Sequence, residues 1–329
     1  MKIGILYNLV DCIERGFEID KLSDNEISGT VEYVRRALEK EHEVIPIRIR
    51  RELLPQLTRE SFDFVFNLCE GIEGDVQGEA LIPALLDIIK IPYTGSDSLT
   101  LGLCIDKIKT KHLLIANNIP TPDYQVFYNS SQKLNSGLTF PLIVKPAHED
   151  ASVGITVDSV VNNEPALFKR IEFIIKNYRE TALVEEYIDG RELNVSILGN
   201  GNSIEVLPIS EIVFDFNENA PNIVSYEAKW LMESEMFQKT YGVCPANLPA
   251  DIELNIKKIA IDAYKITGCR DYARVDFRME KNVPYVLEVN PNPGINIDSG
   301  FVRSASAEGL SYNGLIKKIL STAVKRCQK

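Results

Sequence analysis

Three oxygen-bearing side chains in the last quarter of the chain have the types and spacing of a metal site. Glu288 and Asn290 are two residues apart in the run YVLEVNPNPGIN, so in a β-strand both would point to one face. Leu287 and Val289 would then point into packing. The alternating run DYARVDFRME lies just upstream, and the polar KNVP between the runs is typical of a hairpin turn. If the runs pair, Asp276 joins the same face.

Carboxylate and amide oxygens are hard ligands of the kind that Mg²⁺ prefers, with water and phosphate oxygens in its remaining positions. The three side chains therefore indicate a magnesium–nucleotide site. Taken alone, they fit the solvated outer face of an antiparallel hairpin better. The choice between these interpretations depends on the rest of the chain.

Two lysines and a group of acids are candidates for binding a nucleotide. Lys145 ends the apolar run FPLIVKP and precedes the polar loop AHEDASVGI, so it could clamp a phosphate or simply snorkel at a strand end. Lys107, in CIDKIKTKH, is typical of an exposed helix residue when taken alone. The acids of VEEYIDGRE fit a solvated strand end equally well. None of these segments decides the function by itself.

Composition limits the classes of protein and partner. The chain has 329 residues, 45% hydrophobic and 25% charged, which predicts a water-soluble globular protein of two or three lobes. A net charge of −11 and a pI near 5.0 argue against a nucleic-acid or anionic-membrane partner. The six cysteines are scattered without a C-x-x-C pair, which is typical of reduced thiols. With no signal-peptide or membrane-span pattern, we expect a cytoplasmic location.

The pattern of elements predicts three lobes. Strands and helices alternate over residues 1–96, which predicts a Rossmann-like parallel α/β lobe in which the capping box SDNE at 23–26 opens a helix. No G-x-G-x-x-G follows the first strand. Residues 97–185 begin with one helix and continue as a small lobe of strands and a helix. Residues 186–329 form the third lobe, in which the long polar stretch 214–245 is predicted to be a lid loop.

Taken together and in order, these segments resemble the ATP-grasp superfamily and, within it, the D-alanine–D-alanine ligases. The resemblance covers nearly all of the chain after about residue 60 and is carried by PYTGS, DK, VKP, SVG, VEEYIDGREL, SYEAKW, CPANL, GCRDYARVDF and LEVNPNPGI. It implies an α/β protein with α+β lobes, whose ATP-grasp fold follows the Rossmann-like lobe. It also implies a ligase that joins a carboxylate to an amine through an acyl phosphate.

The resemblance implies ATP and Mg²⁺ as cofactors. Two Mg²⁺ ions would bind, or Mn²⁺ instead of Mg²⁺. Lys107 and Lys145 would contact the α- and β-phosphates, and Lys229 on the lid loop would reach the γ-phosphate. The loop that contains Ser152 and Gly154 would fold over the phosphates through its backbone amides. These assignments follow from the family and not from the residue types alone.

Further binding and catalytic roles follow from the same resemblance. Glu185 would accept from the adenine amino group, and the ribose hydroxyls would bind Glu192. The backbone groups of Glu186 and Ile188 would face the adenine ring. The metal ligands would be Asp276, Glu288 and Asn290, and the oxyanion donors would be Arg274 and the backbone N–H of Gly294. Strand alternation places Arg274 and Asp276 on one face, as is required if the oxyanion donor and the metal ligand act at the same site.

The sequence departs from the family at the pocket for the first substrate. The family holds the first ammonium with a Glu in a G-x-S-x-E stretch, linked through a Ser and a lid-loop Tyr. This chain lacks that stretch and has Ala151 and Trp230 at the Ser and Tyr positions. An indole donates one hydrogen bond and accepts none, so these side chains cannot form the trio. Glu70 or Glu73, in a segment without the family's His, could replace the ammonium ligand or be solvated loop acids.

At the second substrate, Ser299 falls at the family's carboxylate-binding Ser, but Gly300 replaces the Leu that follows. We therefore expect a ligase for small amino-acid-like substrates with an altered first pocket. Three alternatives stay open: a genuine D-alanine–D-alanine ligase of cell-wall synthesis, a non-catalytic ATP-binding regulator, and an ATP-grasp kinase that phosphorylates a hydroxyl. The resemblance also implies a homodimer.

Overall fold

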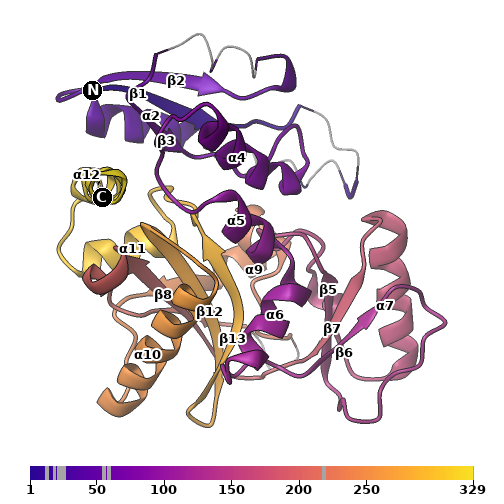
Figure 1. Ribbon diagram of the computed structural model, residues 1–329. Helices are drawn as coiled ribbons and strands as arrows, with labels where there is room; N and C mark the ends of the chain where they lie inside the picture. Colours follow the sequence, from indigo (N-terminus) through magenta and orange to yellow (C-terminus); the bar gives the residue numbers. More distant parts are fainter. Residues whose placement is uncertain are drawn as a thin grey trace.

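Three β-sheets organise the chain in the computed structural model, which describes residues 1–11, 15–17, 20, 27–53, 57, 61–216 and 220–328. Figure 1 shows the N-terminal sheet at the top, the largest sheet below it, and the smallest sheet beside the largest. The predicted capping box at 23–26 lies outside the described residues.

The N-terminal sheet is parallel, as the alternation of strands and helices predicts. Its strand order is β2-β1-β3, and both neighbours of β1 run parallel to it. The apolar run of β1 is buried between helices, as expected for a parallel strand. The elements of this part are β1 (Lys2–Tyr7), α2 (Ile27–Leu38), β2 (Glu43–Arg48), η2 (Arg51–Leu53), β3 (Phe64–Asn67), η3 (Val76–Ala80) and α4 (Leu81–Ile88).

The segment after this sheet forms two helices, where the sequence pattern predicts one. The helices are α5 (Ser98–Ile105) and α6 (Lys107–Ala116). Asp106 between them has an extended backbone, and its side chain accepts a hydrogen bond from the Lys109 N–H at 2.9 Å. An aspartate in this position caps a new helix, so the prediction of a continuous helix is wrong. As a result, Lys107 is the first residue of α6.

The small sheet is antiparallel, with strand order β4-β7-β5-β6. Helix α7 packs on one face of it, against alternate residues such as Leu142, Val144 and Val184. Strand alternation therefore turns Lys145 and Glu185 to the opposite face. The elements are β4 (Tyr124–Phe127), β5 (Leu142–Pro146), η4 (Val157–Ser159), β6 (Val160–Val161), α7 (Glu164–Asn177) and β7 (Ala182–Glu186).

The large sheet is antiparallel, in the order β11-β10-β8-β12-β13, with β9 also paired to β8. Helix α10 covers one face. The predicted lid loop at 214–245 contains two short helices and ends in an edge strand, so it is more ordered than expected. The elements are β8 (Arg191–Leu198), η5 (Gly201–Ser203), β9 (Glu205–Val206), β10 (Ser210–Phe214), α8 (Tyr226–Trp230), α9 (Glu235–Gln238), β11 (Thr240–Val243), α10 (Ala250–Ile266), β12 (Tyr272–Glu280) and β13 (Val283–Pro291).

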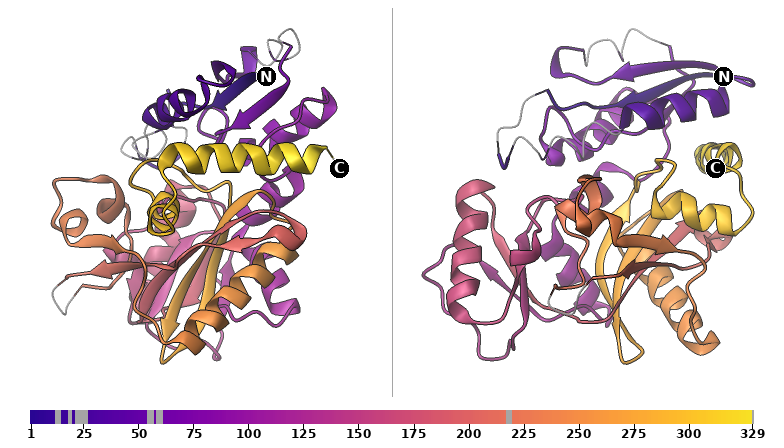
Figure 2. Two further views of the ribbon diagram at one scale, coloured as in Figure 1. Left: turned by 90° about the vertical axis from the view of Figure 1, so that its left-hand side faces the viewer. Right: turned by 180° about the vertical axis from the view of Figure 1, so that it is seen from behind.

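The C-terminal helices return to the N-terminal sheet. Helices α11 (Gly300–Ala307) and α12 (Tyr312–Cys327) share one buried apolar cluster with β1, α2 and β3. Figure 2 shows α12 lying between the N-terminal sheet and the rest of the molecule. Arg326 of α12 pairs with the buried Asp271. Oδ2 of Asp271 also accepts a hydrogen bond from the Gly95 N–H at 2.8 Å. Within the described ranges, no helix is long and apolar enough to cross a membrane.

Candidate active site

The β12–β13 hairpin brings the predicted metal ligands together. Asp276 lies opposite Glu288, and the Asn290 amide donates to Asp276 Oδ2 at 2.9 Å and to Glu288 Oε1 at 3.3 Å. The register shifts beside this pair, so that Leu287 has no partner on β12 and is only half-buried. The prediction that Leu287 points into packing is therefore wrong. Because the bulge inserts one residue, Val286 is buried while Glu288 still faces the site.

Arg274 binds the same carboxylate from its own strand. Its Nε and Nη2 donate to the two oxygens of Asp276, each at 2.7 Å. The Asn194 amide of β8 donates to Asp276 Oδ1, also at 2.7 Å. A bidentate guanidinium with a further amide donor fixes the orientation of this carboxylate. Arg274 and Asp276 thus lie on one face of β12, as predicted.

The donor set fits a hard divalent cation. Carboxylate and amide oxygens are the ligands that Mg²⁺ prefers, and the ion commonly completes its shell with water and phosphate. Burial favours the neutral form of Glu288, but the charges of Lys107, Lys145 and Arg274 outweigh it and lower the pKa of Glu288 to about 2. In the part of the chain that the structure describes, no group of three or more His, Cys, Asp or Glu could hold a metal. The present site has two carboxylates, and its third donor is an amide.

Glu185 and Lys145 of the small sheet form a buried charged group with Lys111 of α6. Glu185 pairs with Lys145 at 2.5 Å and with Lys111 at 2.8 Å, and Glu185 and Lys111 are each about 1% exposed. Sequence reasoning missed Lys111, although it lies four residues after Lys107 on the same helix face. Burial opposes ionisation of Glu185, but the two ammonium groups outweigh it and lower its pKa.

The other predicted nucleotide contacts lie at the ends of β7 and β8. Glu192 pairs with Arg278 at 2.7 Å. The Glu186 N–H donates to the Asp123 carbonyl at 2.9 Å, so this N–H is engaged within the protein. Ile188 is buried. Lys107, predicted from its local sequence to be exposed, is buried, and its ammonium donates to the Glu149 carbonyl.

The predicted phosphate loop is bound to the lid segment by three hydrogen bonds. Ser152 Oγ donates to the Val224 carbonyl at 2.8 Å, and the Tyr226 N–H donates to the Ile155 carbonyl at 2.8 Å. The Trp230 indole N–H donates to the Ala151 carbonyl at 3.0 Å. The acceptor is the main chain of Ala151, so this bond does not depend on the side chain that the trio would require. The lid and the phosphate loop therefore form one connected unit.

Gly154 of the phosphate loop and Lys229 of the lid segment are two further predicted contacts of ATP in this unit. Gly154 has φ +74°, and a Cβ there would lie 2.8 Å from the Pro146 ring, so glycine is required. Lys229 of the short helix α8 is exposed to solvent, and its ammonium lies 5.0 Å from the Trp230 ring centre. Desolvation by the surrounding groups and the charge of Arg274 lower the pKa of Lys229. The charge of Arg274 therefore acts on the Lys229 ammonium.

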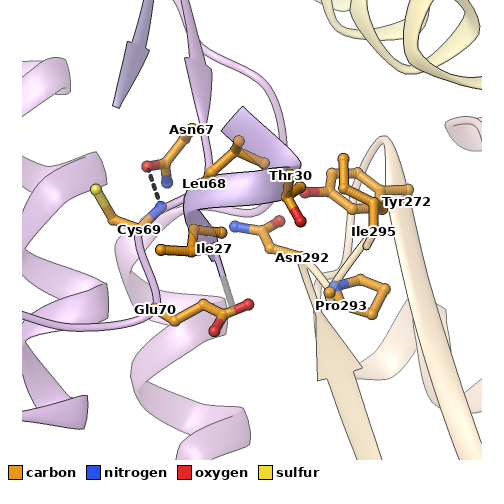
Figure 3. Close-up of a pocket in the computed structure, with 11 residues that line it drawn as sticks. Ile27, Thr30, Asn67, Leu68, Cys69, Glu70, Tyr272, Asn292, Pro293 and Ile295 are labelled. Atoms are coloured by element: carbon orange, nitrogen blue, oxygen red, sulfur yellow. Dashed lines mark hydrogen bonds between the residues drawn. The ribbon is translucent and has the colours of Figure 1, made fainter. Parts of the chain in front are cut away.

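A small pocket lies between the N-terminal sheet and the end of β13 (Figure 3). Glu70 points into it from the loop after β3, toward the side on which Pro293 lies. A Cβ atom on Gly294 would lie 3.8 Å from Glu70 Oε1. The alternative acid, Glu73, pairs with Arg51 at 3.1 Å. The lining is completed by Ile27, Thr30, Asn67, Leu68, Cys69, Tyr272, Asn292 and Ile295.

Ser299 is the N-cap of α11. Its hydroxyl accepts a hydrogen bond from the Val302 N–H at 3.3 Å. A capping hydroxyl still has its own proton to donate, so this contact is compatible with the predicted carboxylate binding. Ser299 therefore caps α11 in addition to its predicted role in substrate binding.

Comparisons with known proteins agree on one group of relatives. Residues 113–321 match the family described as "D-ala D-ala ligase C-terminus". A D-alanine–D-alanine ligase of Carboxydothermus hydrogenoformans is 36% identical over 90% of this chain and 92% of that protein. An uncharacterised protein, y4sG, of Sinorhizobium fredii is 37% identical over 84% of this chain and 80% of that protein. The ATP-complexed D-alanine–D-alanine ligase of Bacillus anthracis superposes with a TM-score of 0.78 at 26% identity, covering 100% of this chain and 99% of its own.

Proposed function

This chain belongs to the D-alanine–D-alanine ligase family of ATP-dependent ligases, and from that premise we propose that it joins the carboxylate of one small amino acid to the amine of another. The observation that carries the proposal is the row formed by Arg274, Asp276 and Glu288, with Asn290 bonded to both acids. A regulator without turnover has no need of an arginine aligned on its metal carboxylate, so this row favours an enzyme.

We propose that ATP binds between the small sheet and the β12–β13 hairpin. The charges of Lys107 and Lys145 lower the pKa of Glu288, which supports a place for both lysines beside the metal ligands and their assignment to the α- and β-phosphates. Glu185 and Glu192 would contact adenine and ribose, with backbone groups of Glu186 and Ile188 on the ring. The loop of Ser152 and Gly154, held to the lid by Ser152 Oγ, would cover the phosphates. Asp276, Glu288 and Asn290 would hold Mg²⁺, which neutralises the charge of the phosphates when it is bound.

The proposed reaction has two covalent steps. A carboxylate oxygen of the first substrate attacks the γ-phosphorus of ATP, the bond to the β-phosphate oxygen breaks, and an acyl phosphate and ADP form. The amine of the second substrate then attacks the acyl carbon, a proton leaves the nitrogen, and phosphate departs. Arg274 and the Gly294 N–H would stabilise the tetrahedral oxyanion, and Lys229 would balance charge on the γ-phosphate. The lid segment excludes water, which would otherwise hydrolyse the acyl phosphate.

We propose that Glu70 binds the ammonium of the first substrate. It lines the pocket beside Gly294, so an ammonium on Glu70 would leave the attached carboxylate near the proposed oxyanion donor. Glu73 pairs with Arg51 outside this pocket and is the weaker candidate. Trp230 forms part of the lid above the phosphate loop through its bond to Ala151. This arrangement supports a first pocket that differs from the family's trio.

A genuine D-alanine–D-alanine ligase is the second candidate. It is favoured by the identity of 36% to the C. hydrogenoformans ligase over nearly the whole of both chains. Under this hypothesis Glu70 replaces the usual ammonium ligand, and both substrates are D-alanine. The two candidates share all of the ATP machinery and differ only in the substrate pockets.

We propose a cytoplasmic homodimer. The cysteines of the described segments are free thiols, which fits a reducing compartment. Leu81, Ile88 and Leu99 on the neighbouring helices α4 and α5 are exposed, with Ile88 at 76% and Leu99 at 83%. Exposed apolar residues on helices that contact each other are suited to a subunit interface. Sedimentation of the wild type and of Ile88→Lys tests this, because the lysine would shift a dimer toward monomer.

The reaction is tested by measuring ADP release from ATP and Mg²⁺ with D- and L-amino acids, singly and in pairs, with products identified by mass spectrometry. Dialanine as the main product selects the second candidate. Another dipeptide, with no turnover of D-alanine, selects the altered ligase. Glu70→Gln should raise KM for the first substrate by about 10-fold or more, since a charged hydrogen bond is lost, while Glu73→Gln is the matched control. No ADP with any pair would contradict both candidates.

A further inference from the structure

Arg303 is a half-buried arginine without a carboxylate partner in the described segments of the chain. Its Nη1 donates to Ser210 Oγ at 3.0 Å, and its Nη2 donates to the Asp298 carbonyl at 3.3 Å. The arginines of the large sheet behave differently, because each has an acid within salt-bridge distance: Arg191 with Glu211, Arg274 with Asp276 and Arg278 with Glu192. A partly buried guanidinium that lacks such a partner can bind an external anion at little further cost in desolvation.

The position of Arg303 links it to the catalytic row. Ser210, to which it donates, is aligned with Asn194, Asn194 with Asp276, and Asp276 with Glu288, across four adjacent strands. Neighbouring strands are about 4.8 Å apart, so Ser210 lies on the order of 10 Å from Asp276 along this row. That distance suits the two ends of one amino acid with an extended side chain. Arg303 is thus within reach of a substrate held at Arg274.

Two glycines lie next to the guanidinium. A Cβ atom on Gly242 would collide with the guanidinium carbon of Arg303, so the side chain lies directly on β11. A Cβ atom on Gly300 would lie 3.3 Å from Asn194 Oδ1 and 3.9 Å from Arg303 Nη1. Any larger side chain at position 300 would therefore enter the space between these polar groups. With glycine there, no side chain of residue 300 separates the Asn194 amide from the guanidinium.

We infer that Arg303 determines specificity for the amine substrate and selects one whose side chain ends in a carboxylate. This inference rests on the proposed ligase function and specifies its second substrate. The reacting amine would lie near Arg274 and Gly294, and the side-chain carboxylate would accept from the Arg303 guanidinium through the space beside Gly300. Ser299 would remain available for the α-carboxylate. Arg303 is a binding residue in this scheme and takes no part in the covalent steps.

The first experiment compares acid and amide forms of the second substrate. Aspartate against asparagine, and glutamate against glutamine, are each tested in both stereochemical forms in the ADP-release assay with ATP and Mg²⁺. The wild type should prefer the acid over its amide by about 10-fold or more in kcat/KM, since a charge-assisted bidentate contact is at stake. Arg303→Gln should bring this ratio close to one, with KM for ATP unchanged.

Two controls separate binding from folding. Lys318→Gln makes the same change in charge on α12, outside the site, and should keep the acid preference. Arg303→Lys keeps the charge and should retain part of the preference, which a purely structural anchor on Ser210 would not predict. An equal rate with acid and amide in the wild type, or an intact preference in Arg303→Gln, would overturn the inference.

A binding measurement decides the inference even if no pair supports turnover. Saturation-transfer NMR with Mg²⁺ and a non-hydrolysable ATP analogue should detect aspartate or glutamate on the wild type and lose it in Arg303→Gln. Absence of binding to the wild type, or equal binding to the variant, contradicts the role of Arg303. Failure of ADP release with every pair contradicts the ligase proposal instead, so the two failures are distinguishable.

Discussion

The indole Nε1 of Trp230 donates a hydrogen bond to the carbonyl oxygen of Ala151 at 3.0 Å, and so joins the lid helix α8 to the phosphate loop. The acceptor is a main-chain atom, which every residue type at position 151 would provide. Ala151 itself has φ +49°, so its carbonyl direction is set by an unusual backbone conformation. Closure of this lid therefore depends on the indole donor and on the loop backbone.

Trp230→Phe should weaken lid closure, because phenylalanine keeps the ring but removes the N–H donor. One neutral hydrogen bond contributes about 1 kcal/mol, so KM for ATP should rise by roughly 5-fold. The fraction of ATP hydrolysed without peptide formation should also rise, because water enters more easily. Steady-state ADP release and product yield measure both effects. Ala151→Ser is the matched control and should behave like the wild type; a large effect there would mean that the side chain at 151 matters.

Glu288→Gln should remove most of the dependence of ATP binding on Mg²⁺. Glutamine keeps the shape but lacks the negative charge that a divalent cation requires. We expect Mg²⁺ to strengthen ATP binding to the wild type by about 10-fold or more and to have little effect on the variant. Calorimetric titration with ATP, with and without Mg²⁺, gives the ratio. Glu280→Gln, at the exposed end of the same hairpin, should retain the full effect, and the proposed metal role is wrong if Glu288→Gln also retains it.

Lys111→Met should destabilise the fold. The lysine and Glu185 are both buried, and removal of one partner leaves Glu185 with Lys145 as its single cation among the described residues. Loss of one partner from a buried pair costs about 3–5 kcal/mol, and the remaining lysine reduces this to roughly 2–3 kcal/mol. Urea unfolding measures the change. Lys109→Met removes an exposed pair with Asp106 and should change the free energy of unfolding far less. Equal costs for the two variants would refute this account.

Much of the fold follows from local patterns in the sequence. The alternation of strands and helices predicts the parallel N-terminal sheet, and the alternating runs around KNVP predict the β12–β13 hairpin that aligns Asp276 with Glu288. The order of several short motifs predicts an ATP-grasp fold, which the similarity to the B. anthracis ligase over the whole chain confirms. These features depend on periodicity and motif order, both of which can be read without coordinates.

The remaining features depend on contacts between distant segments or on backbone atoms. Lys111 and Glu185 are 74 positions apart, and their pairing is decided by how α6 packs against β7. The bulge at Leu287 follows from a change in register that residue types do not reveal. The Trp230 contact uses a carbonyl group, which is common to all residues. The hydrogen bonds of Arg303 to Ser210 and to the Asp298 carbonyl likewise join segments that the sequence does not show to be neighbours.

His148 connects the phosphate loop to two other segments. Its Nδ1 lies 2.7 Å from Oε2 of Glu180, two residues before β7, and its Nε2 lies 3.5 Å from Oδ2 of Asp106, the N-cap of α6. The contact with Glu180 chiefly raises the pKa of His148 above its ordinary value of 6.5, against the effect of partial burial. The charged imidazolium is therefore favoured in the folded protein.

This shift predicts how stability depends on pH. A group whose pKa is raised by folding stabilises the protein fully below its unfolded pKa, and that contribution is lost as the pH rises through the folded pKa. The wild-type free energy of unfolding should therefore include a contribution that is present in full below pH 6.5 and is lost as the pH rises through the raised pKa of His148. His148→Gln and Glu180→Gln should both lack this contribution, so their difference from the wild type should shrink between pH 6 and pH 9. Urea unfolding at a series of pH values measures it, and a difference that stays constant or grows over that range would show that the imidazolium does not hold the loop.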